Sequence, residues 1–437
     1  MKRLLCLLAA FAFISGANAQ NASQDVRELL RQDPTRAANL HHTYEIPEIV
    51  DTPAPEGYVP FYISHYGRHG SRYHTSESKI TEISVYLDTL LAEGLLTDEG
   101  KAVYNTLSIV KEEHEDLGGI LTQKGSLDHQ GISQRMFERF NPVFNQQDRK
   151  DVLCISTDVQ RCIQSMANFS MQLKGNSPGL NISLYTGPRF KKYLVADVPF
   201  QKTNVRRANV RDSILRASLN TGRIMKAWFT NQNEAVRHFG KNDPAKFIYK
   251  VFQAGIIAQN MDIENPYIYK YFTEDEIYAM WRTDNAEKYG IMCASIENER
   301  ISDEIGRTIL KHIVSKADEA LASGSTKAAD LRFGHDSGLL PLISFIQIEG
   351  QDKIMHMADA EANGWYGFVA MPMASNLQLV FYRKTADATD ACSCDNDILV
   401  KILFNEKETT IPALPTFCGP YYKWSKLREY FTKLLNE

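Results

Sequence analysis

Three short stretches of the sequence combine arginine and histidine side chains in a way that suits a phosphoryl group. The first is Arg68-His69-Gly70-Ser71-Arg72, the second brings Arg161, and the third is His335-Asp336. Guanidinium groups bind phosphate oxygens in a bidentate way, and imidazole N–H groups donate to the same oxygens. Because the transition state of phosphoryl transfer spreads negative charge over its equatorial oxygens, fixed positive charges of this kind also stabilise it.

Each stretch follows a segment with the pattern of a strand, namely residues 58–64, 151–157 and 328–333. In open α/β sheets, sites form at the carboxyl ends of the strands, where helix N-termini also favour anions. Taken singly, each stretch has an ordinary explanation as a solvated face, a turn or a helix cap. Taken together, the three strand ends predict a single anion site, provided that the strands are neighbours in the sheet.

A metal site is the first alternative, because His65, His69 and His74 lie close together in the sequence. The spacing of His65 and His69 would suit a zinc-binding helix. Gly67 and Gly70 interrupt that segment, however, and the neighbouring arginines would repel a cation. There is also no P-loop, no dinucleotide-binding glycine motif after a strand and no G-x-S-x-G elbow. We therefore favour an anion site over a metal site.

The remaining pattern predicts how these stretches are positioned. Strands alternate with helices, which indicates an α/β fold with a central sheet flanked by helices. A helix is expected near residues 25–31, helical structure over 76–114, further strands at 377–382 and 398–405, and a final helix around Trp424 to Leu434. The segment 191–324 is dominated by helical patterns. We predict that residues 20–190 and 325–437 form the α/β domain and that 191–324 form an inserted helical domain.

The composition and the N-terminus restrict the class of protein. The chain has 437 residues and a net charge of -4, which argues against a nucleic-acid binder that relies on bulk basicity. Lys2 and Arg3, an apolar run over residues 4–14 and Ala17-Asn18-Ala19 have the form of a secretory signal peptide over residues 1–19. No later run is long enough to span a membrane. We expect an exported protein, periplasmic or secreted, with no obligate protein partner.

Six cysteines lie beyond this leader. An oxidising compartment makes disulfides plausible, and six cysteines allow 15 connectivities. Cys392 and Cys394 are predicted to be structural, with a link to Cys418 near the C-terminus. The alternative, that some of the six are buried free thiols, stays open at this point.

The motifs resemble those of a known family. Arg68 to Arg72 matches the R-H-G-x-R signature of the histidine acid phosphatase branch of the histidine phosphatase superfamily, and His335-Asp336 matches its second motif. Arg161 resembles the third phosphate-binding arginine, and Leu121-Thr122 with Gly125 resembles the L-T-x-x-G helix start. The similarity runs in order from about residue 57 to 436. It implies a phosphoglycerate-mutase-like central mixed sheet with an inserted helical cap domain.

The C-terminal part is similar to bacterial relatives of the multiple inositol polyphosphate phosphatases, over Pro372 to Leu377 and Leu403 to Lys407. Those enzymes usually carry His-Ala-Glu as the second motif. This chain has His335-Asp336-Ser337 instead, as in phytases and acid phosphatases. Inositol polyphosphates such as phytate are therefore the first expected substrates. The alternatives are a broad acid phosphatase acting on sugar phosphates or nucleotides, and a phosphoester-binding protein without catalysis.

The resemblance also implies a role for each residue. His69 would be the nucleophile that forms a phosphohistidine, and Asp336 would protonate the leaving group. The residues expected to hold the phosphoryl oxygens are Arg68, Arg72, Arg161 and His335. No metal or organic cofactor is implied. Lys202 and Arg206, at the start of the helical segment, are expected to line a basic rim for the other phosphates of the substrate, unless they belong to an ordinary solvated face.

Overall fold

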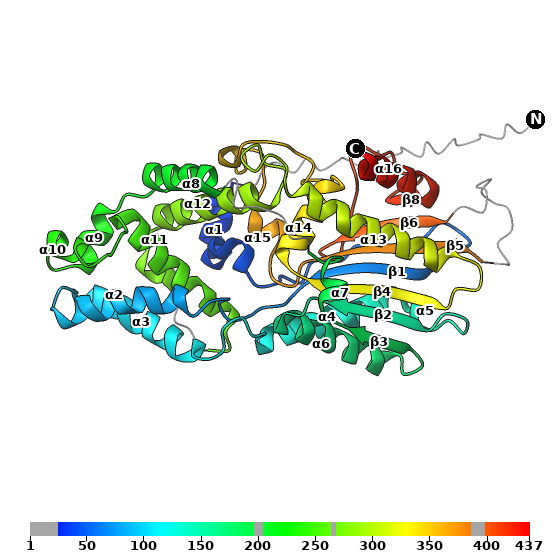
Figure 1. Cartoon of the computed structure of the whole chain (residues 1–437), viewed down its shortest axis with the longest axis horizontal. Coiled ribbons are helices and arrows are strands. Elements are labelled where there is room, and N and C mark those ends of the chain that lie inside the picture. The colour runs from blue at the N-terminus through cyan, green and yellow to red at the C-terminus, as the bar shows by residue number, and fades with distance from the viewer. Residues whose placement is uncertain (1–24, 196–203, 264–267, 386–397) are drawn as a thin grey trace, which may run out of the picture.

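The computed structural model describes residues 25–195, 204–263, 268–385 and 398–437. The predicted signal peptide, Lys202, Cys392 and Cys394 lie outside these ranges, so the predictions made for them stay predictions. At the centre of the described chain is an eight-stranded mixed sheet (Figure 1). Its strands are β1 Tyr58–Arg68, β2 Asp151–Ser156, β3 Asn181–Tyr185, β4 Lys327–Gly334, β5 Asn376–Lys384, β6 Leu399–Phe404, β7 Lys407–Thr409 and β8 Tyr421–Lys423.

The strands lie in the order β3-β2-β4-β1-β5-β6-β7, and β8 pairs with β6. β3, β2, β4 and β1 are mutually parallel, whereas β5 to β8 join in an antiparallel manner. The three strands that carry the site motifs are therefore neighbours, as the convergence of the motifs requires. β1 extends four residues beyond its predicted end because it pairs with β4 and β5 on both sides as far as Gly67. The short strands β3, β7 and β8 have no counterpart in the prediction.

Side chains alternate between the two faces of the sheet, and each face is covered by helices. Tyr62 and Phe381 pack on one face with α13, α14 and α16, whereas Ile63 and Val380 pack on the other with α4, α5 and α6. Figure 1 shows these two layers above and below the strands. The covering helices are α4 Gln123–Arg139, α5 Asn141–Phe144, α6 Gln160–Asn176, α13 Asp303–Leu321, α14 Asp336–Phe345 and α16 Trp424–Asn436.

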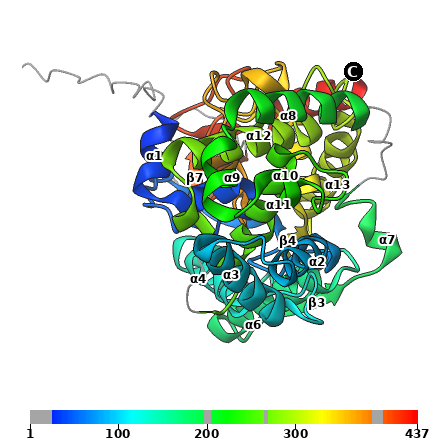
Figure 2. The ribbon, with the colours of Figure 1, turned by 90° about the vertical axis from the view of Figure 1, so that its left-hand side faces the viewer.

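A third layer of helices, in addition to the two that cover the faces of the sheet, lies beyond the carboxyl ends of the strands (Figure 1). Its hydrophobic core joins segments that are distant in sequence, with Leu30, Leu87, Leu107, Phe252 and Trp281 among its members. Figure 2 views the molecule from this side. The elements of this layer are α1 Val26–Gln32, η1 Pro34–His41, α2 Ser78–Ala92, α3 Asp98–His114, α8 Asn204–Ser218, α9 Gly222–Trp228, α10 Gln232–Val236, α11 Pro244–Gly255, η3 Ile256–Asn260, η4 Ile268–Tyr271 and α12 Glu274–Met292.

The layer thus combines α1 to α3 with the helical segment that starts near residue 191. Conversely, α13 falls within that segment but packs on the sheet through Ile305, Ile309 and Ile313. The boundaries 191–324 remain a prediction of the domain organisation. Three short elements connect these layers, namely α7 Pro188–Lys191, η5 Met357–Asp359 and α15 Gly367–Ala370.

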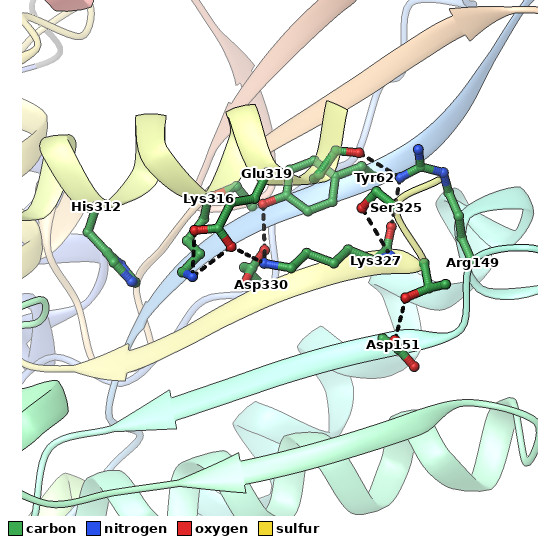
Figure 3. Close-up of polar contacts among 12 residues, drawn as sticks. Tyr62, Arg149, Asp151, His312, Lys316, Glu319, Ser325, Lys327 and Asp330 are labelled. Carbon is green, nitrogen blue, oxygen red and sulfur yellow. Dashed lines mark hydrogen bonds and ion pairs between the residues drawn. The ribbon is translucent and has the colours of Figure 1, made fainter. Parts of the chain in front are cut away.

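A polar network holds the end of α13 against the sheet (Figure 3). The Tyr62 hydroxyl donates to buried Asp330 at 2.8 Å, and Lys327 bonds Glu319 at 2.7 Å. Arg149 donates to the backbone oxygens of Ala320 and Lys327 at 2.8 and 3.0 Å. Because these contacts join β1, β4, α13 and the lead-in to β2, they fix the strand ends opposite those that carry the motifs.

No helix among the described residues is long and apolar enough to cross a membrane. Cys154, Cys162 and Cys293 are buried free thiols, as the sequence left open. Burial raises the pKa of the Cys154 and Cys162 thiols to about 12, so both stay protonated at ordinary pH.

Candidate active site

The structure brings six of the predicted site residues together at the carboxyl ends of β1, β2 and β4. Gly67 of β1 pairs with Phe333 of β4, and Ser156 of β2 pairs with the same residue from the other side. The residues that follow these three strands therefore lie side by side. The six residues are Arg68, His69, Arg72, Arg161, His335 and Asp336.

Arg68 is the most buried cation of this group, with no exposed surface. One terminal nitrogen, Nη1, donates to the carbonyl oxygens of Leu40 and Met371, both at 2.6 Å. The other, Nη2, pairs with Asp336 Oδ2 at 2.8 Å. Burial lowers the pKa of Arg68, although Asp336 counteracts this effect. Its guanidinium thus connects three separate segments of the chain at the site.

Arg72 and Arg161 complete a cluster of three arginines. Burial, Arg161 and Arg68 together lower the pKa of Arg72 to about 9. The Nε atoms of Arg68, Arg72 and Arg161 are all buried and have no hydrogen-bond partner among the described residues. Because a buried donor without a partner is costly, three of them at one place suit an anion that accepts their hydrogen bonds.

His69 is held in a conformation and protonation state that suit a nucleophile. Its Nδ1 lies 3.0 Å from the Gly70 carbonyl oxygen, which can only accept, so the proton is on Nδ1 and the lone pair is on Nε2. Burial, followed by Arg161 and Arg68, keeps the pKa of His69 well below its usual value. The backbone of His69 is fixed by bonds to Gly334 and Ala374, at 2.9 and 3.0 Å.

His335 lies edge-on to His69, with the ring centroids 5.6 Å apart. Arg161 Nη2 donates to its Nδ1 at 3.3 Å, and Thr157 Oγ1 lies 3.1 Å from its Nε2. Burial and Arg161 lower the pKa of His335 to about 4. Since a guanidinium can only donate, Nδ1 accepts here and the ring proton is on Nε2, which donates to the Thr157 hydroxyl.

Asp336 is the first residue of α14 and the only carboxylate of the six. Burial by itself would raise its pKa, but Arg68, Arg72 and other cations reverse this effect and lower it to about 2. One oxygen accepts from the Ser337 backbone N–H at 2.8 Å, and the other pairs with Arg68. At ordinary pH Asp336 is therefore a carboxylate.

Tyr66 is a residue whose part in the site the sequence does not reveal. Its buried hydroxyl donates to the Leu194 carbonyl oxygen at 2.5 Å and is hydrogen bonded to the backbone of His335. A Cβ at Gly334 or at Gly338 would come within 2.2 Å of this hydroxyl oxygen. The two glycines flank His335-Asp336, so Tyr66 fixes the turn that presents these two residues.

The L-T-x-x-G segment, residues 121–125, packs against the loop of residues 68–72. The Thr122 side chain caps α4 by accepting from the Gly125 N–H, and its backbone N–H donates to Ser71 at 3.0 Å. A Cβ at Gly70 would lie 2.5 Å from the Gly125 oxygen, and a Cβ at Gly125 would lie 2.2 Å from the Ser71 oxygen. The two backbones therefore touch, which explains why both positions are glycine.

Asp128 of α4 contacts the same loop through Ser71, whose hydroxyl donates to it at 3.2 Å. Burial raises the pKa of this carboxyl to about 7, even though the hydrogen bonds from Ser71 and the charges of Arg135 and Lys124 act against the shift. The sequence does not identify Thr157, Asp128 or Tyr66 as site residues, because each of them acts through a neighbouring residue. The only sequence signals were the place of Thr157 at a strand end and that of Asp128 next to the L-T-x-x-G segment.

Among the described residues, no hydrogen bond or ion pair joins His65 or Arg206 to this group, and Lys202 lies outside the described residues. His65 packs between the rings of Phe169 and Phe333, at 5.3 and 5.4 Å, and not beside His69. Arg206 is exposed on α8, and no hydrogen bond or ion pair joins it to another described residue. Its predicted contact with the substrate stays a prediction, as does that of Lys202.

Comparison with solved structures identifies the class of fold. The multiple inositol polyphosphate phosphatase of Bifidobacterium longum, in complex with inositol hexasulfate, matches 91% of this chain and 97% of its own, with a TM-score of 0.76 at 19% identity. The same protein in complex with phosphate gives a TM-score of 0.77. The phytase of D. castellii matches 98% of this chain and 90% of its own, with a TM-score of 0.67 at 14% identity.

The chain therefore has the fold of phytase-type histidine phosphatases, which confirms the expected mixed sheet flanked by helices. The particular proteins it resembles are this inositol polyphosphate phosphatase and this phytase, in agreement with the family indicated by the motifs. The sequence by itself matches no protein-family model and no curated protein.

The contact between Gly70 and Gly125 leads to the first prediction. In Gly125→Ala the new methyl group meets backbone atoms of Ser71, so the loop must shift. We expect the free energy of unfolding to fall by about 1–3 kcal/mol. Gly175→Ala, in α6, is the control, because its Cβ meets nothing within 4 Å. Urea denaturation of both variants measures the difference, and equal stability would contradict the close contact.

A second prediction concerns the pH dependence of stability. The pKa of Asp128 is about 7 in the folded chain, against an ordinary value of 3.8, so the carboxyl group takes up a proton when the chain folds between these pH values. The resulting stabilisation is complete below about pH 4 and is lost as the pH rises through 7. Between pH 5 and pH 8 the melting temperature of Asp128→Asn should therefore fall less than that of the wild type. Asp98→Asn, at an exposed aspartate, is the control. Parallel curves for Asp128→Asn and the wild type would refute the raised pKa.

Proposed function

We propose that this chain is an exported phosphomonoesterase that works through a phosphohistidine on His69, without a metal ion, and that hydrolyses inositol polyphosphates. The observation that carries the proposal is the group of three arginines beside a neutral histidine, with the carboxylate of Asp336 paired to Arg68 of the same group. A binding protein would need the arginines alone, whereas His69 and Asp336 add a nucleophile and a proton donor. The signal peptide predicted for residues 1–19 supports export.

In the first step, His69 Nε2 attacks phosphorus and the P–O bond to the alcohol breaks. Asp336 gives its proton to the departing alkoxide oxygen. In the second step, Asp336 accepts a proton from water, which attacks the phosphohistidine and breaks the P–N bond. Inorganic phosphate leaves and His69 returns to its neutral form. The proposed clamp for the phosphoryl oxygens is formed by Arg68, Arg72, Arg161 and His335.

For this mechanism, Asp336 must be protonated when the substrate is bound. Its low pKa comes from Arg68 and Arg72, and a bound phosphate would neutralise these same arginines. The added negative charge also lies beside the carboxylate, and both effects raise its pKa. When Arg161 turns from His335 Nδ1 to a phosphoryl oxygen, the ring would carry its proton on Nδ1 and donate to the phosphoryl group, with the Thr157 hydroxyl donating to Nε2.

The experiment that tests the proposal is phosphate release from phytate by the mature chain in EDTA, with His69→Ala alongside. We expect release by the wild type and none above background by the variant. If phosphate is released only from sugar phosphates or nucleotides, the result favours the alternative of a broad acid phosphatase over an inositol polyphosphate phosphatase. Failure to hydrolyse any of these esters would leave only the phosphoester-binding alternative.

Asp336→Asn tests the assigned proton donor. The alcohol of an inositol phosphate is a poor leaving group and needs a proton, whereas nitrophenolate hardly does. We expect kcat for phytate to fall by about 10²-fold or more, and kcat for p-nitrophenyl phosphate to fall far less. Steady-state kinetics on the two substrates measure this contrast. A uniform loss on both substrates would show that Asp336 does not act as the acid.

A further inference from the structure

A tight turn between β6 and β7 carries a fully buried carboxylate. The turn consists of Asn405 and Glu406, whose φ angles are 48° and 64°. Positive φ angles at both central residues define a type I′ hairpin turn, in which the second position is usually glycine. Glu406 occupies that position and has no exposed surface. Backbone strain of this kind persists only where the surrounding structure fixes it, so it points to a role for the side chain.

The Glu406 carboxylate joins the turn to the C-terminal part of α4. Arg135 donates to it through Nη2 at 2.7 Å and through Nε at 3.0 Å, and the Tyr44 hydroxyl donates at 2.9 Å. Arg139 Nη1 donates to the backbone oxygen of Glu406 at 2.9 Å. Because two arginines of one helix bind this single residue, the turn and the helix are fixed relative to each other.

The N-terminal part of α4 contacts the loop of residues 68–72. The Thr122 N–H donates to Ser71 at 3.0 Å, and the Ser71 hydroxyl donates to Asp128 at 3.2 Å. These contacts fix the loop from the side of α4. Because a helix moves as a rigid element, the position of its C-terminal part, which Glu406 binds, affects where its N-terminal part meets the loop.

A second connection runs from Asn405 to the end of β1. The side-chain oxygen of Asn405 accepts from the Asn376 N–H at 3.1 Å, and its backbone N–H donates to the Asn376 oxygen at 2.8 Å. Directly before Asn376, the backbone of residues 374–375 bonds the backbone of Arg68 and His69, at 2.8 and 3.0 Å. The backbone that carries the proposed nucleophile is therefore connected to the same turn.

We propose that Asn405 and Glu406 are positioning residues, which hold the imidazole of His69 in the orientation for attack on phosphorus. Glu406 acts through α4, and Asn405 acts through Asn376. Stability by itself does not account for the buried ion pair, since apolar residues of similar volume often stabilise a fold as well or better, whereas a buried pair can specify one conformation. The inference rests on the proposed function, because it concerns the nucleophile of that reaction.

Glu406→Gln tests the connection through α4. Among the described residues, none of the hydrogen-bond partners of the Arg68 guanidinium belongs to the turn, so the phosphate clamp should stay in place. A displaced nucleophile lowers the rate of the chemical step and not the affinity for the substrate. We therefore expect kcat for p-nitrophenyl phosphate to fall by about tenfold and KM to stay within about twofold. Unchanged kcat, or a loss that lies only in KM, would overturn the proposal.

A matched control separates positioning from stability. Glu276 pairs with Arg223 in the helical layer at 2.8 and 2.6 Å, and its side chain is 7% exposed. Glu276→Gln thus breaks a buried ion pair of the same type away from the loop. It should lower the melting temperature by an amount similar to that of Glu406→Gln and leave kcat unchanged. The same loss of kcat in both variants would show a general effect of stability and overturn the proposal.

Two replacements of Asn405 test the second connection. Asn405→Gly permits the positive φ angle but lacks the side-chain acceptor, whereas Asn405→Asp keeps an oxygen that accepts from the Asn376 N–H. We expect kcat to fall by about threefold to tenfold with glycine and to be close to that of the wild type with aspartate. Equal kcat values in the two variants would show that this hydrogen bond does not position the nucleophile, and would remove Asn405 from the proposal.

Hydrogen exchange of the backbone amides of residues 68–72 tests the coupling without catalysis. Exchange should be faster by about threefold or more in Glu406→Gln than in the wild type, and unchanged in Glu276→Gln. Equal exchange rates in Glu406→Gln and the wild type would refute the coupling even if the wild type hydrolyses no ester. Conversely, faster exchange in a protein that hydrolyses no ester would contradict the proposed function and not the connection between the turn and the loop.

Discussion

The site depends above all on the buried guanidinium of Arg68. It bonds the end of η1 through Leu40, the turn before β5 through Met371 and the start of α14 through Asp336. A buried cation is costly unless its donors are satisfied. The geometry of these three segments is therefore tied to the presence of this charge. The helical layer, the sheet and the proposed acid are positioned by the same side chain.

The same burial sets the electrostatics of the site. It keeps His69 neutral and lowers the pKa of Arg72, while the mutual repulsion of the arginines acts in the same direction. One carboxylate, Asp336, stands against three arginines, so this group of residues carries an excess of positive charge. In the proposed mechanism a bound phosphate would remove this imbalance and at the same time raise the pKa of Asp336. Binding and acid catalysis would then be linked through one set of charges.

The sequence allowed the motif-bearing strands to be predicted, because β1, β2 and β4 are apolar runs that end in glycine or polar residues. It also indicated that their loops converge, since parallel neighbours share one edge. The pattern did not reveal β3, β7 and β8, which are short and partly exposed. Nor did it reveal that α1 to α3 share a hydrophobic core with α9, α11 and α12. That core depends on packing between segments far apart in the chain, which leaves no local periodic signal.

By itself, the sequence determined the chemistry, because the residue types at 68–72, 161 and 335–336 fix which groups are available at the strand ends. Only the tertiary structure decided how these groups are held. Tyr66, Thr157 and Asp128 act through a neighbouring residue, and no motif marks them. The physical reason is that charge and hydrogen-bonding capacity belong to single residues, whereas burial, pKa and convergence arise from the packing of distant ones.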